Sequence, residues 1–196
     1  GKSTTIKCLV GIHSFEKGSI MLDGLSIKDN PIEFKHQISY VPDNPDLYEF
    51  LTGMEYINFV SNVYDEDVSK EDIINLAKKF NLENNLLEPI RTYSHGMKQK
   101  IALIGALIHK PKLIVLDEPF VGLDPKAAFI VKKAMIEFCK NGGAIFFSTH
   151  VLEIAEKLCN KIAIIKKGQL ITTGLMSEVT KNASLEEVFM EQSENE

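Results

Sequence analysis

The chain lacks an apolar stretch long enough to cross a membrane as a helix. Its longest run of apolar residues and glycine extends only from Ile101 to Ile108, whereas a spanning helix needs about 20 apolar residues. Cysteine is also scarce, since Cys8, Cys139 and Cys159 are the only three. Their odd number argues against a disulfide framework, and their spacing does not fit metal binding. We therefore expect buried, reduced thiols.

An excess of positive charge is also absent. The sequence has 22 Lys and Arg against 27 Asp and Glu, which gives a net charge of -5. A broad basic surface for nucleic acid is therefore not favoured, and we expect no nucleic-acid partner. Internal repeats, low-complexity segments and heptad runs are missing as well. With 196 residues, of which 44% are hydrophobic, the chain can bury the core of a single globular domain.

The first residues contain only half of a known motif. Gly1-Lys2-Ser3-Thr4 matches the end of the phosphate-binding loop G-x-x-x-x-G-K-[ST]. In that loop the backbone cradles phosphate oxygens, the lysine reaches the β- and γ-phosphates, and the hydroxyl binds magnesium. Taken alone, these residues are more often a solvated terminus than a phosphate site. The first half of the loop and its strand are missing, so we expect a fragment that neither binds ATP tightly nor hydrolyses it by itself.

Two stretches of the sequence are predicted to be strands of a parallel sheet. Residues 113–116 are four apolar residues without alternation, which predicts a strand buried on both faces. Asp117 and Glu118 follow at the edge where open α/β sheets bind ligands. Residues 144–148 form a second such strand, and His150 stands at its corresponding end. The alternative is that Asp117 and Glu118 merely begin a loop.

The rest of the pattern predicts an α/β fold in a single domain spanning residues 1–196. Thr52 and Glu55 have the spacing of a helix-capping box. Consecutive helices between strands predict a small helical subdomain over residues 52–109, inserted in a core of residues 1–51 and 110–196. The expected strands cover 38–41, 161–165 and 169–172, with a hairpin over 18–27. The expected helices cover 5–10, 52–63, 69–80, 94–108, 125–139 and 151–158, and a last one begins near 184.

The order of these motifs resembles the nucleotide-binding domain of ATP-binding cassette (ABC) transporters, from Gly1 to about Phe189. The resemblance implies a P-loop NTPase fold with a mainly parallel, RecA-like sheet and a helical subdomain. The motifs that carry it are a truncated Walker A (residues 1–5), the Q-loop position after 40–42, a signature-like Tyr93-Ser94-His95-Gly96-Met97, a Walker B strand ending in Glu118, a D-loop (122–125) and a switch residue, His150.

The resemblance implies ATP and Mg²⁺ as cofactors, with a role for each matching residue. Lys2 would hold the β- and γ-phosphates, together with the backbone of Gly1 and Thr4. Ser3 and Asp117 would bind or orient magnesium. Glu118 would act as the general base, and His150 would contact the γ-phosphate.

Two chains of this family close head-to-tail around two ATP molecules. Ser94 and Gly96 would therefore serve the nucleotide of a second nucleotide-binding domain, and Asp124 would communicate across the interface. The other implied partner is a transmembrane permease subunit, which would hold the protein on the cytoplasmic, inner face of the cell membrane. The loop at Asp43 and the helix over 52–63 would receive it.

The sequence departs from the family pattern at three points. Asp43 stands where the family usually has glutamine, and could bind the metal or repel Glu118 and the phosphates. His95 and Met97 replace a glycine and a glutamine of the usual signature. The aromatic residue that stacks on adenine is absent.

The expected function is therefore ATP hydrolysis that powers a membrane transporter. The signature and the final Leu-Glu-Glu-Val-Phe resemble those of exporter subunits. One alternative is a soluble ABC ATPase that acts on ribosomes or nucleic acid, and another is an inactive fragment. The flanking sequence would best separate these readings.

Overall fold

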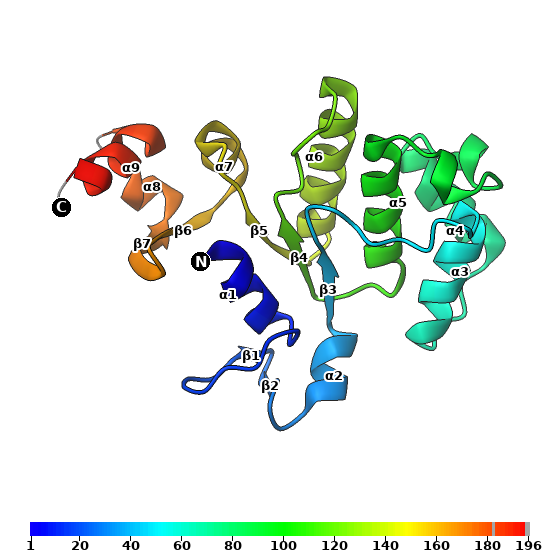
Figure 1. Ribbon diagram of the computed structural model, residues 1–196, viewed down its shortest axis with the longest axis horizontal. Coiled ribbons are helices and arrows are strands. Elements are labelled where there is room, and N and C mark those ends of the chain that lie inside the picture. Colours follow the sequence, from blue (N-terminus) through cyan, green and yellow to red (C-terminus); the bar gives the residue numbers. More distant parts are fainter. Residues whose placement is uncertain (182, 195–196) are drawn as a thin grey trace.

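A parallel three-stranded sheet lies at the centre of the computed structural model (Figure 1), which describes residues 1–181 and 183–194. Its strands are β3 (Ile38–Val41), β4 (Leu113–Asp117) and β5 (Ala144–Ser148), in the order β3-β4-β5. The register aligns Tyr40 with Val115, and Val115 with Phe146. All three strands therefore end at the same edge, as predicted for residues 113–118 and 144–150.

The central strand β4 is buried on both faces, which confirms the interpretation of its uninterrupted apolar run. Ile114 and Leu116 are 2% and 0% exposed and belong to one hydrophobic cluster. Val115, which is 0% exposed, points the other way into a second cluster with Ile6 and Phe34. Successive strand residues point to opposite faces, so one short strand holds two cores together.

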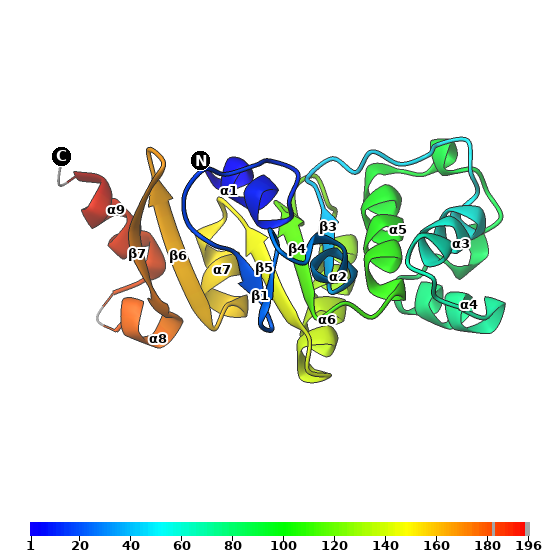
Figure 2. The same cartoon turned by 90° about the horizontal axis from the view of Figure 1, so that it is seen from below.

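Helices cover both faces of this sheet (Figures 1 and 2). On one face lie α1 (Lys2–Leu9) and α2 (Pro31–His36), and on the other lie α6 (Pro125–Lys140) and α7 (Leu152–Leu158). A small antiparallel hairpin of β1 (Met21–Leu22) and β2 (Leu25–Ser26) precedes α2. The result is the layered α/β arrangement that the sequence predicts.

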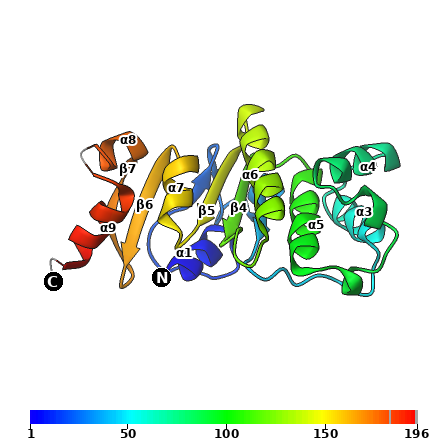
Figure 3. The same cartoon turned by 90° about the horizontal axis from the view of Figure 1, so that it is seen from above.

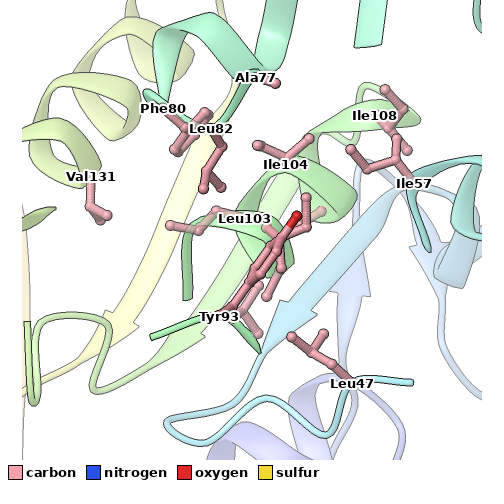
Figure 4. Close-up of a cluster of buried hydrophobic side chains, with 14 of the residues drawn as sticks. Leu47, Ile57, Ala77, Phe80, Leu82, Tyr93, Leu103, Ile104, Ile108 and Val131 are labelled. Carbon is pink, nitrogen blue, oxygen red and sulfur yellow. The ribbon is translucent and has the colours of Figure 1, made fainter. Parts of the chain in front are cut away.

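A group of helices lies beyond β3 at one end of the molecule. It consists of α3 (Gly53–Val63), α4 (Lys70–Lys79), α5 (His95–Ile108) and the 3₁₀ turns η1 (Glu83–Asn85) and η2 (Ile90–Thr92). Its core continues without a break from α3 and α5 to Leu116 on β4 and Val131 on α6, and Figure 4 shows part of this cluster. The limits of the helical subdomain, 52–109, stay a prediction.

The chain ends in an antiparallel hairpin and two helices (Figure 3). These are β6 (Lys161–Lys166), β7 (Gln169–Leu175), α8 (Met176–Val179) and α9 (Leu185–Glu194). Strand β6 lies next to β5, but no ladder joins the two strands in the part of the chain that the structure describes. A pocket of about 400 Å³ between them is lined by residues of both strands, of α1 and of α7.

The structure corrects one expectation and adds to the predicted elements. Cys139 is exposed and the other two thiols are only partly buried, so the expectation of buried cysteines is wrong. Cys139 continues the spacing of the buried Val131 and Met135 on α6, but steps of four residues drift around a helix of 3.6 residues per turn. Helices α2 and α8 were not predicted, and β7 continues to Leu175.

Among the described residues, no helix is long and apolar enough to span a membrane.

Candidate active site

Three predicted residues meet at the carboxyl edge of the sheet. Glu118 lies between a lysine and a histidine: Lys2 Nζ is 3.2 Å from its Oε1, and His150 Nδ1 is 3.0 Å from its Oε2. The backbone N–H of His150 also donates to Oε2, at 3.3 Å. Lys2 donates a further hydrogen bond to the carbonyl of Thr149, at 3.2 Å. Residues 2, 118 and 150 are far apart in sequence, so the fold itself assembles this cluster.

Glu118 is held in an unusual backbone conformation. Its φ of 48° lies in the left-handed region, which costs a residue other than glycine about 1 kcal/mol or more. Such strained residues occur often at functional sites, where the surrounding structure holds them in place. The side chain is only 17% exposed, so the carboxylate lies partly buried at the edge of the sheet.

Ser148 connects the two neighbouring acids and was not identified from the sequence. Its hydroxyl donates to Asp117 Oδ1 and accepts the backbone N–H of Glu118, at 3.2 Å. Asp117 is 5% exposed, and Ser148 is paired with it in the β4–β5 register. The only signal in the sequence was the position of Ser148 at the end of a buried strand, next to His150.

Asp43 lies at the same edge, and among the described residues no hydrogen bond or ion pair joins its side chain to the cluster. Its Oδ1 accepts the backbone N–H of Asn44, at 2.8 Å. The pKa of Tyr40 is raised mainly by burial, and the negative charges of Asp117 and Asp43 raise it further. The structure therefore places two carboxylates around Tyr40, with Asp43 one strand away from Asp117.

Lys2, Ser3 and Thr4 form the first turn of α1 and are exposed, with Gly1 as the N-cap. No side chain caps this end, and the first turn contains no acidic residue. A Cβ at Gly1 would lie 3.4 Å from Gly168 Cα, so the backbone passes close to the β6–β7 turn. Free N–H groups, the helix dipole and an ammonium group together suit an anion such as phosphate.

The residues present also fit a magnesium ion held mainly by phosphate. Ser3 and Asp117 supply a hydroxyl and a carboxylate, which are oxygen ligands of the kind that Mg²⁺ prefers. Among the described residues, no three or more His, Cys, Asp or Glu side chains form a metal site by themselves. Mg²⁺ commonly binds through one or two carboxylates and substrate phosphates, without a complete protein cage.

The signature-like residues lie apart from this cluster, beside the D-loop. Ser94 caps α5 by accepting the N–H of Met97, at 3.3 Å, at the start of the helix predicted over 94–108. A Cβ at Gly96 would lie 3.9 Å from Asp124 Oδ2, so the two motifs pack together. Asp124 itself caps α6, and its pKa is lowered chiefly by the backbone N–H of Ala127. No hydrogen bond joins Ser94, Gly96 or Asp124 to Lys2, Glu118 or His150 in the described chain.

A family model described as "ABC transporter" matches residues 1–121. This chain belongs to the ABC transporter family. The ABC chain is 35% identical over 198 residues to the ABC-type transporter ATP-binding protein EcsA of Bacillus subtilis (strain 168), a match that covers 97% of this chain and 80% of EcsA. It is 32% identical to the uncharacterized ABC transporter ATP-binding protein sll0415 of Synechocystis sp. (strain ATCC 27184 / PCC 6803 / Kazusa), with 100% of this chain and 56% of that protein covered.

Two solved structures share the fold of the ABC chain. One, described as the structure of the ATP-binding subunit of an ABC transporter, matches with a TM-score of 0.90 and 33% identity, over 99% of this chain and 84% of that one. The other is cbiO1 from Clostridium perfringens, described as part of the ABC transporter complex cbiONQ. It matches with a TM-score of 0.78 and 25% identity, over 100% of this chain and 79% of that one.

These comparisons confirm the P-loop NTPase fold and the membership in a family of ATP-binding ATPases. They name the family but assign no role to any residue of this chain. They also do not cover the whole length of the relatives, and the chain spans only about half of sll0415. The roles of Lys2, Glu118 and His150 therefore depend on the geometry described above.

Proposed function

We propose that the intact protein hydrolyses ATP to power a membrane transporter, with Glu118 as the general base. The observation that carries this proposal is the position of Glu118 between Lys2 and His150, with 3.2 and 3.0 Å contacts to its two oxygens. A lysine that suits phosphate and a carboxylate that can accept a proton are groups used in phosphoryl transfer to water, and the histidine can orient the carboxylate.

Each residue has a specific task in this proposal. Bound ATP would supply the γ-phosphoryl group, and Lys2 and the first turn of α1 would hold its phosphates. Ser3 and Asp117 would bind or orient the Mg²⁺ ion. Glu118 accepts a proton from the attacking water. His150 keeps Oε2 of Glu118 oriented and contacts the γ-phosphate. An anion bound at Lys2 would compete with Glu118 Oε1 for the ammonium group, which frees that oxygen for the water.

The catalytic assignment is tested by Glu118→Gln in the intact protein. Glutamine keeps the size of the side chain but cannot accept the proton, so we expect the hydrolysis rate to fall by at least about 100-fold. ATP binding should persist, because Lys2 and the start of α1 are unchanged. The measurements are phosphate release and binding of a fluorescent ATP analogue.

A matched control is Glu153→Gln, which removes an exposed carboxylate paired with Lys157 on α7. It should leave turnover unchanged. Hydrolysis by Glu118→Gln at the parent rate would contradict the assignment. Turnover by residues 1–196 alone would contradict the reading of this segment as inactive.

The proposal includes an ATP-sandwich dimer with a second nucleotide-binding domain. Its support is the separation between the two groups of predicted residues in one chain. Gly96 packs beside Asp124, and no hydrogen bond of the described chain joins this group to Lys2 or Glu118, which supports a role at the phosphate of another chain. A helix N-terminus supplied in this way would stabilise the γ-phosphate after closure.

The proposed partner in the membrane is a permease subunit, received beside α3. Three exposed aromatic residues gather there: Phe59 on α3 contacts Tyr48, and Tyr48 contacts Phe50. Phe50 is 75% exposed. A groove of about 320 Å³ runs next to them, between the segment 39–47 and α3. Exposed apolar patches of this kind mark interaction sites. This surface would keep the protein on the inner face of the membrane.

Replacing Phe50 and Phe59 by serine tests this surface. Aromatic anchors carry much of the energy of an interface, so we expect co-purification with the permease to fall at least tenfold. The ATP affinity of the ATPase should not change, because both residues are distant from Lys2. Matched replacement of the exposed Phe129 on α6 is the control.

Unchanged co-purification of the Phe50/Phe59 variant would contradict this surface. Recovery of ribosomes or DNA with the parent protein would favour the alternative of a soluble ABC ATPase.

Export is the proposed direction of transport, supported by the resemblance of the signature and of residues 185–189 to exporter subunits. Transport into inside-out vesicles tests it.

A further inference from the structure

His95 makes a hydrogen bond that links the signature-like turn to the D-loop within one chain. Its Nε2 is 3.2 Å from the backbone carbonyl of Val121. A carbonyl oxygen only accepts hydrogen bonds, so Nε2 must carry the proton. His95 occupies the position where the resemblance expects glycine, a residue that could not make this contact.

The D-loop is shaped to receive the imidazole ring. Gly122 has a φ of 70°, and a Cβ there would lie 3.1 Å from both Cδ2 and Nε2 of His95. Any other residue at position 122 would therefore be strained in its backbone and would press on the ring. The hydrogen bond and the close approach of Gly122 are separate observations that place His95 against the same loop.

This contact lies two hydrogen bonds away from the proposed base. The backbone N–H of Val121 donates to the carbonyl of Glu118, at 3.2 Å, and the carbonyl of Val121 accepts from His95. Glu118 has the strained φ of 48°, so its orientation depends on the turn that follows it. On the other side, Gly96 adjoins His95 and packs beside Asp124.

We propose that His95 is a positioning residue that couples the two nucleotide sites of the closed dimer. This inference rests on the proposed function. The turn at Ser94 and Gly96 faces the nucleotide of the second chain, whereas Glu118 acts on the nucleotide of its own chain. His95 joins these two groups through Val121, so a nucleotide bound at one site orients the base at the other.

The coupling arises only when the dimer closes. In the single chain both His95 and Val121 are exposed, and an exposed hydrogen bond contributes little because water competes for both groups. Closure around nucleotide would remove that water and strengthen the bond. His95 therefore contributes to turnover rather than to the stability of the separate chain.

The test compares His95→Leu with His95→Gln in the intact protein. Leucine fills the space without a donor, whereas the amide nitrogen of glutamine can reach the carbonyl of Val121. We expect His95→Leu to lower kcat at least about fivefold with less than a twofold change in KM. The Hill coefficient for ATP should fall toward one. His95→Gln should recover at least half of kcat, and the unfolding midpoint should be the same in all three proteins.

A His95→Leu enzyme with kcat and Hill coefficient within the error of the parent would overturn the inference. So would a His95→Gln enzyme as slow as His95→Leu, because the donor would then be irrelevant. A lowered unfolding midpoint that parallels the loss of kcat would reduce His95 to a structural role. Glu118→Gln separates the two proposals: if it abolishes turnover while His95→Leu does not, only the coupling fails.

Discussion

At the scale of single residues, His109 is a buried side chain in which one ring nitrogen lacks a hydrogen-bond partner among the described residues. The hydroxyl of Ser39 donates its proton to the carbonyl of Ala106, at 2.6 Å. Ser39 Oγ can therefore only accept from His109 Nε2, which lies 3.2 Å away. Nδ1 then keeps a lone pair and has no hydrogen-bond partner in the described chain. Tyr64 stacks on the ring with centroids 3.6 Å apart. The arrangement favours a neutral imidazole.

This predicts that the protein loses stability in mild acid. Burial lowers the pKa of His109 most, the backbone of Ile38 and the charge of Glu66 partly oppose this, and His36 adds a smaller lowering. The unfolded chain protonates at about pH 6.5, whereas the folded chain resists protonation to lower pH. Between these values the unfolded state binds more protons, so the free energy of unfolding falls as pH falls below about 6.5.

The measurement is the urea midpoint between pH 7.5 and 5. His109→Gln should flatten this dependence, and the same substitution at the exposed His13 controls for the change of residue type. An equally steep dependence in His109→Gln and the parent would show that His109 is not the responsible group.

The residue scale also shows what the sequence could and could not predict about the site. Asp117, Glu118 and His150 were predictable because parallel strands end at one edge of a sheet, whatever their separation in sequence. Ser148 and the contact of His95 with Val121 were not. Both depend on hydrogen bonds between segments whose relative position no periodicity encodes.

At the scale of elements, the helix α3 begins with a complete capping box. Thr52 Oγ1 accepts the N–H of Glu55, at 3.2 Å, and the carboxylate of Glu55 accepts the N–H of Thr52, at 2.8 Å. Backbone hydrogen bonding by Thr52 lowers the pKa of Glu55. The spacing in the sequence predicted this start correctly, because capping is a local interaction.

We expect Thr52→Ala to lower the free energy of unfolding by about 1 kcal/mol. Alanine cannot accept the N–H of Glu55, so a helix end is left without its partner. Thr52→Ser keeps the hydroxyl and is the matched control, with an expected loss below half of that of alanine. Equilibrium unfolding in urea gives both values, and equal losses in the two variants would contradict the capping role.

Elements that depend on tertiary packing were harder to predict than α3. The short helix α2 has Pro31 at its first position, a favourable start, but its six residues are too few for a helical period to stand out. Its stability comes from Phe34, which is 1% exposed and packs with Ile38. The exposure of Cys139 was equally hard to predict, because four-residue steps drift away from the buried face of α6 defined by Val131 and Met135.

At the scale of the whole molecule, the two halves of the proposed chemistry lie on opposite sides of β4. Lys2 and His150 reach Glu118 from α1 and from the end of β5, whereas Ser94 and Gly96 belong to α5, beyond β3 (Figure 1). One continuous core is shared by β4, α5 and α6, the elements next to these two groups. This arrangement supports the proposal that a second chain completes each site, in which case ATP should bring two chains together.

The last prediction is that this closure can be blocked at Gly96 without damage to the fold. We expect the intact Glu118→Gln protein to dimerise with ATP, since it binds nucleotide but does not consume it. A Cβ at Gly96 would lie 3.5 Å from Ala127 Cβ and 3.9 Å from Asp124 Oδ2, which are ordinary contacts. Adding Gly96→Ala should therefore preserve the dimer.

Adding Gly96→Asp should instead keep the protein monomeric, because a new carboxylate would face both Asp124 and the phosphate of the second chain. Size-exclusion chromatography with light scattering, with and without ATP, measures the difference. Alanine and aspartate both add a Cβ at position 96. The two variants therefore differ only in the carboxylate group that aspartate carries. ATP-dependent dimers of the aspartate variant would place the signature turn away from the nucleotide, and the proposed sandwich would then be wrong.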